Sequence, residues 1–68
     1  MSMVWFTDIK NQQKIAINPR YVVVVFTATE QPQGIEDDVV GKTVLGMVTG
    51  NVIVEEPELE VVTALNGG

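Results

Sequence analysis

The sequence predicts a small, mainly β domain of five short, strongly bent antiparallel strands followed by one C-terminal helix. Thirteen of the 68 residues are Val, a residue that favours strands. An unbroken apolar run, Tyr-Val-Val-Val-Val-Phe, occupies positions 21–26; it is too short to cross a membrane as a helix, and its β-branched residues disfavour a soluble helix. Pro57 suits the first turn of a helix and separates the strands from the final segment.

The first two strands are expected at residues 3–9 and 15–17, as a hairpin around a polar turn. Pro19 ends this hairpin, because proline cannot donate a ladder hydrogen bond. The third strand is expected at residues 21–29 and contains the apolar run. Since the run does not alternate with polar residues, we expect a central strand that is buried on both faces.

A polar loop at residues 30–38 leads to a long fourth strand at residues 39–49. This strand contains Gly41 and Gly46, and glycine within a strand typically marks a bulge or a bend. Bends of this kind allow a short sheet to curl into a barrel. The last turn and the fifth strand are expected at Thr49-Gly50-Asn51 and at residues 52–54.

The final helix is expected at residues 57–66, where it covers an open end of the sheet. Leu59, Val62 and Leu65 recur at helical spacing, and Val61 lies beside them, which predicts one apolar stripe. We find no internal repeat and no linker. The whole chain is therefore interpreted as a single domain.

The side chains present argue against an enzyme and against a cofactor. The sequence has no Cys and no His, which excludes disulfides, ordinary zinc sites and Ser-His or Cys-His nucleophiles. Three consecutive acids, Glu36, Asp37 and Asp38, lack the alternating oxygen ligands and the central Gly of a calcium loop. We therefore interpret them as part of a solvated loop, and we predict a non-enzymatic protein without a bound metal.

The formal net charge of −5 argues against extensive, non-specific wrapping of nucleic acid, which depends on clustered Lys and Arg. The N-terminus lacks the features of a signal peptide, and no segment is long and apolar enough to span a membrane, so we expect a cytoplasmic protein without a membrane partner. A domain this small has a limited core, and its apolar strand edges carry few charges. We therefore expect identical copies to pair edge to edge, in a ring if the rotation closes.

The stretch Val-Thr-Gly-Asn-Val-Ile-Val at residues 48–54 resembles the second signature of the Sm and LSm proteins. Gly50, Asn51 and Ile53 match that signature, whereas Thr49 replaces its basic residue. Residues 23–30 resemble the end of the first signature. The chain is similar in particular to small Sm-like proteins of marine metagenomic and phage-borne sequences, although Sm proteins usually carry their helix before the strands.

This resemblance implies a bent, five-stranded Sm-like barrel, a homo-oligomeric ring, and binding of RNA or single-stranded DNA in nucleic-acid processing. In the family, the contacts lie in the loop before the third strand and in the turn between the last two strands. A simpler interpretation stays open, in which these positions only form turns and begin a strand. The candidate nucleic-acid-binding residues are Asn18, Arg20, Tyr21, Gly50 and Asn51, with Lys42 as an outlying phosphate contact.

A second resemblance competes with the first. Ile-Ala-Ile-Asn-Pro at residues 15–19, the Thr49-Gly50 turn and Glu-Val-Val at residues 60–62 are similar to the FlbD-type small proteins of flagellar operons. This resemblance covers most of the chain and places the helix after the strands. It implies a protein-interaction or structural assembly module that does not bind nucleic acid.

Overall fold

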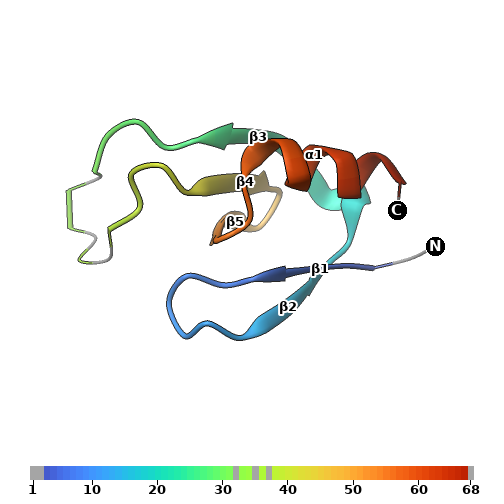
Figure 1. Ribbon diagram of the computed structural model, residues 1–68. Helices are drawn as coiled ribbons and strands as arrows, with labels where there is room; N and C mark the ends of the chain where they lie inside the picture. The colour runs from blue at the N-terminus through green and yellow to red at the C-terminus, as the bar shows by residue number, and fades with distance from the viewer. Residues whose placement is uncertain (1–2, 32, 35, 37, 68) are drawn as a thin grey trace.

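The computed structural model describes residues 3–31, 33–34, 36 and 38–67 of the chain. Its five antiparallel strands and single C-terminal helix confirm the predicted mainly β architecture (Figure 1). The elements in chain order are β1 (Val4–Thr7), β2 (Lys14–Ile17), the short 3-10 helix η1 (Pro19–Tyr21), β3 (Val22–Thr27), β4 (Thr43–Met47), β5 (Gly50–Val54) and α1 (Glu58–Gly67).

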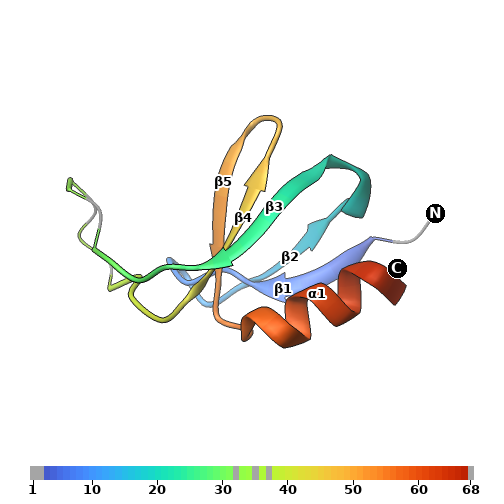
Figure 2. The ribbon, with the colours of Figure 1, turned by 90° about the horizontal axis from the view of Figure 1, so that it is seen from above.

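The strands form two sheets and do not close into the expected barrel (Figures 1 and 2). β1 and β2 form a two-stranded sheet, and the three-stranded sheet has the order β3-β4-β5. The two sheets meet where β1 and β5 end: the Ile9 N–H donates to the Ile53 carbonyl at 3.3 Å, and the Glu55 N–H donates to the Thr7 carbonyl at 2.9 Å. Between β2 and β3, η1 turns the chain, so these two consecutive strands do not pair.

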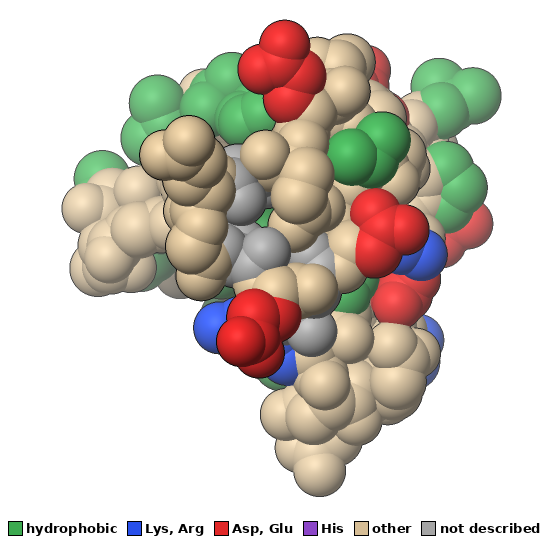
Figure 3. Space-filling view, turned by 90° about the vertical axis from the view of Figure 1, so that its left-hand side faces the viewer, with side chains coloured by type: hydrophobic (Ala, Val, Ile, Leu, Met, Phe, Trp, Pro, Cys, Tyr) green, Lys and Arg blue, Asp and Glu red, His purple; other side chains and the backbone are tan. Residues whose placement is uncertain are grey.

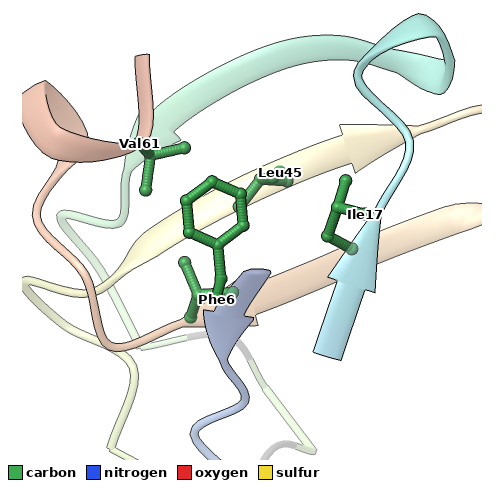
Figure 4. Close-up of a cluster of buried hydrophobic side chains, with 5 residues drawn as sticks. Phe6, Ile17, Leu45 and Val61 are labelled. Atoms are coloured by element: carbon green, nitrogen blue, oxygen red, sulfur yellow. The ribbon is translucent and has the colours of Figure 1, made fainter. Parts of the chain in front are cut away.

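The main core lies between the two sheets and the helix (Figure 4). β1, β2, β4, β5 and α1 each supply one buried apolar side chain, and β3 contributes partly buried ones. This arrangement explains how strands of only four to six residues share one core: each buries one face against the other layer. The buried residues are Phe6, Ile17, Leu45, Val54 and Val61.

Helix α1 buries only part of the apolar stripe that the sequence predicts. Val61 is fully buried, and Ala64 and Leu65 pack beside it on the core. Leu59 is 79% exposed and Val62 is 37% exposed, so neither belongs to the buried stripe. Val61 and Leu65 of the predicted stripe are therefore confirmed, whereas the prediction was wrong for Leu59 and Val62. Leu59-Val62-Leu65 and Val61-Ala64-Leu65 are both spaced for one helix face, and only the position of the sheet selects between them.

The apolar run lies at the edge of its sheet, contrary to the prediction of a central, doubly buried strand. Tyr21 belongs to η1, and β3 pairs only with β4 among the strands that the structure describes. Val23 is 73% exposed, and Val24 and Phe26 are about half exposed. The prediction failed because β1 and β2 pair with each other, so no strand in the described part of the chain reaches the second side of β3.

The fourth strand is shorter than expected, and only Gly46 of the two glycines predicted for it lies inside it. Gly41 precedes β4, where its φ of +84° forms a turn that favours glycine. Gly46 lies inside β4, opposite Val24, and the irregularity in this pair of strands lies in β3 between Val22 and Val24. The β4–β5 turn consists of residues 48–49, so the predicted turn residues Gly50 and Asn51 belong to β5.

Candidate functional site

The outer face of the three-stranded sheet, which points away from the main core, is apolar and only partly covered. Val24, Phe26, Val44 and Ile53 occupy the register positions of this face. The segment after β3 and the β1–β2 connection cover one part of it, where Ala28, Val39 and Val44 form a second buried cluster with Ile9 and Ile53 packed against it. The exposed remainder includes Phe26, at 44%, and Val24, at 49%.

A groove of about 830 Å³ crosses this outer face, and we call it the outer groove. Its floor is apolar and includes Phe26 and Ile53. Charged side chains stand around the floor, and three of the four are acidic: Asp8, Lys10, Glu30 and Glu36. At the end of the molecule that carries the connection between β3 and β4, acidic side chains lie at several places with apolar ones between them (Figure 3). Asp37, from the acidic triplet, lies outside the described residues.

The free edge of β3 is a second candidate surface. Because the N–H of Ala28 donates to Lys42 and its carbonyl accepts from Gly41, the backbone groups of Phe26 and Val24 also face β4, and this alternation ends at the irregularity between Val22 and Val24. The N–H and carbonyl groups of Val25 and Thr27 therefore point toward the free edge. The six residues of β3 carry no charge, and charge is a usual protection of exposed edges.

Five of the six predicted nucleic-acid-binding residues lie near one end of the three-stranded sheet. The Tyr21 carbonyl accepts a hydrogen bond from the Val48 N–H at 3.3 Å, which places η1 beside the β4–β5 turn. Tyr21 is 55% exposed. The Asn18 side chain caps η1, since its Oδ1 accepts from the Arg20 N–H at 3.0 Å. Gly50 and Asn51 follow the turn at the start of β5.

Lys42 does not join this group. It precedes β4, at the opposite end of that strand from the β4–β5 turn. Its ammonium lies 2.6 Å from Glu55 Oε1, and Gln12 Nε2 donates to the other oxygen of that carboxylate at 2.8 Å. The hydrogen bonds from Gln12 and Lys42 lower the pKa of Glu55. Lys42 therefore takes part in a contact between the end of β5 and the β1–β2 connection.

The sequence analysis did not find the outer groove. Its floor combines residues from three strands and two connections, and only the pairing register places them on one face. The alternation of Val24 and Phe26 along β3 was the signal present in the sequence, but the surrounding apolar run concealed it.

The described residues contain no group of three or more acids that could hold a metal ion. In the described part of the chain, no helix has the length and apolar character needed to cross a membrane. No protein-family model, curated protein or solved structure matches the chain. The Sm-like and FlbD-type resemblances therefore depend on the short sequence motifs alone.

Proposed function

We propose that this chain is a non-enzymatic assembly module whose copies associate through the free edge of β3. The observation that carries the proposal is the combination of outward backbone donors and acceptors at Val25 and Thr27 with exposed apolar side chains on the same strand. An added strand would satisfy the backbone groups and bury Val23, which is 73% exposed. Water can satisfy the same backbone groups, but it leaves the Val23 side chain exposed.

The edges favour a two-fold pair of β3 strands over a ring. A ring, as the Sm-like resemblance implies, requires β3 of one copy to pair with β5 of the next. The outer side of β5 is partly occupied, because the Ile53 carbonyl and the Glu55 N–H already bond to Ile9 and Thr7. We therefore expect an antiparallel β3–β3 dimer, whereas a larger closed assembly would point to β3–β5 pairing.

The test is a measurement of mass by light scattering and native mass spectrometry over a range of protein concentrations. Val23→Lys places a charge at the free edge, and we expect it to weaken association at least about tenfold. Leu59→Lys is the matched control, because it adds the same charge at a similarly exposed position, 79%, on α1. A wild-type protein that stays monomeric, or equal weakening by the two substitutions, would overturn the proposal.

A second function, binding of single-stranded nucleic acid, is favoured by one observation: the Tyr21–Val48 hydrogen bond places η1 beside the β4–β5 turn, which leads directly into Gly50 and Asn51. This end offers the exposed Tyr21 ring for base stacking, together with the Arg20 side chain. We expect labelled U-rich or A-rich oligonucleotides to bind at low salt, as measured by fluorescence anisotropy, and more weakly at physiological salt.

Matched substitutions test this second function. Arg20→Gln and Asn51→Ala should weaken binding about threefold or more, whereas Lys14→Gln, which removes one positive charge at the other end of β2, should leave it unchanged. Absence of binding at low salt would eliminate this function. So would equal effects of Arg20→Gln and Lys14→Gln.

A further inference from the structure

We propose that the outer groove binds a short extended segment of a partner protein in which apolar side chains alternate with Lys or Arg. The volume of the groove, about 830 Å³, lies within the range of sites that hold compact ligands. Its apolar lining includes Phe26, Ala28, Val44 and Ile53, whose side chains offer apolar contacts rather than hydrogen bonds. An extended segment presents alternate side chains to opposite sides, so one set contacts the floor while the other reaches the rim.

The charge around the groove selects a basic partner. Asp8, Glu30 and Glu36 line it together with a single cation, Lys10. Glu30 and Glu36 make no hydrogen bond or ion pair with any residue that the structure describes, so their charges are not neutralised there. Lys or Arg side chains at the rim would gain attraction that an acidic or neutral segment would not.

The same charges argue against a second copy of this chain as the occupant. The most exposed apolar residue of α1, Leu59, stands between Glu58 and Glu60, and the whole chain carries a net charge of −5. Insertion of this helix would bring like charges together at the rim, which is unfavourable. The groove is therefore suited to a basic partner that differs from this chain.

Three labelled hexapeptides test the proposal by fluorescence anisotropy at low salt. The first alternates Lys with Val and Phe, the second replaces each Lys by Glu, and the third replaces each apolar residue by Ser. We expect binding of the first peptide and at least about tenfold weaker binding of the other two. Amide chemical-shift changes in two-dimensional NMR should lie on Phe26, Ala28 and Ile53.

Variants of the protein separate the contributions of the floor and the rim. Phe26→Thr keeps a strand-forming residue and should weaken binding about tenfold or more. Glu30→Gln should weaken it about threefold, whereas Glu60→Gln, which changes the net charge equally on α1, should not. Circular dichroism verifies that each variant is folded, and the comparison of Glu30 with Glu60 stays decisive if Phe26→Thr is unfolded.

The binding is independent of the proposed association through β3, so the two can fail separately. Val23→Lys should remain able to bind the basic peptide even where its association is lost. The proposal would be overturned if the Lys and Glu peptides bound equally, or if Glu30→Gln and Glu60→Gln had equal effects. It would also be overturned if the chemical-shift changes were confined to η1 or to the free edge of β3. Absence of binding by the Lys peptide would also overturn it.

Discussion

The Glu56 carboxylate connects the two sheets, and its removal is expected to destabilise the fold strongly. Its oxygens accept hydrogen bonds from the backbone N–H of Thr7 at 2.8 Å and from the Thr7 hydroxyl at 2.9 Å. The Glu56 side chain is only 13% exposed, whereas Lys14, 3.5 Å away, is 65% exposed. The Glu56 carbonyl also accepts from the buried Thr43 hydroxyl, at 2.6 Å, so this residue joins β1, β4 and the start of the helical segment.

The magnitude follows from these contacts. A hydrogen bond to a charged group contributes about 1.5–3 kcal/mol, and a donor left without a partner costs about 1–3 kcal/mol. Glu56→Ala leaves the part-buried N–H of Thr7 without its acceptor, so we expect a loss of about 2–4 kcal/mol in the free energy of unfolding. Thr7→Val removes only the hydroxyl bond and should cost about 1 kcal/mol. Lys14→Gln should cost less than about 0.5 kcal/mol, because the Lys14 side chain is 65% exposed and its ammonium lies 3.5 Å from the carboxylate.

Urea unfolding monitored by circular dichroism at about pH 7 measures these losses as shifts of the midpoint at constant slope. A loss below about 0.5 kcal/mol for Glu56→Ala would refute the role assigned to the carboxylate. A Lys14→Gln loss equal to that of Glu56→Ala would show instead that charge attraction, rather than hydrogen bonding to Thr7, connects the sheets.

The same contact predicts a dependence on pH. Burial raises the pKa of Glu56, but the hydrogen bonds from Thr7 and the charge of Lys14 outweigh it, so the pKa lies below its ordinary value of 4.5. The unfolded chain therefore takes up this proton more readily than the folded one, and stability falls as pH decreases from about 4.5 through the lower folded pKa. The difference between wild type and Glu56→Ala should be constant near neutral pH and shrink in this acidic window; a constant difference throughout would contradict this linkage.

Four further single substitutions test the packing and the backbone strain by urea unfolding. Val61→Ala should lower the free energy of unfolding by about 1.5–3 kcal/mol because the side chain is fully buried, whereas Leu59→Ala should lower it by less than about 0.5 kcal/mol; the reverse order would contradict the burial of Val61 and the exposure of Leu59. Gly46→Ala should lower the free energy of unfolding by about 1–3 kcal/mol, because the added Cβ would lie 2.5 Å from Val24 Cγ1. Adding Val24→Ala to the same chain should recover part of this loss. Gly50→Ala should cost about 1 kcal/mol, because Gly50 has a φ of +139°, and an unchanged midpoint would contradict strain at this position.

The strong local signals of the sequence predicted the elements well. Pro19 and Pro57 mark the ends of strand segments because proline restricts φ and lacks an N–H, and these effects do not depend on distant residues. The hairpin of β1 and β2, the last hairpin and the C-terminal helix follow from such signals. The predicted site residues Asn18, Arg20 and Tyr21 are likewise neighbours in sequence, and their grouping in η1 needs no tertiary information.

What the sequence by itself determined is therefore the mainly β character, the order of the elements and an excess of apolar strand surface. Only the tertiary structure decided which surface is exposed. A run such as residues 21–26 has the same composition at the centre of a sheet or at its edge, and its place depends on which distant strand pairs with it. Because β1 pairs with β2 and leaves one side of β3 open, the free edge and the outer groove result from long-range register, which local residue preferences do not contain.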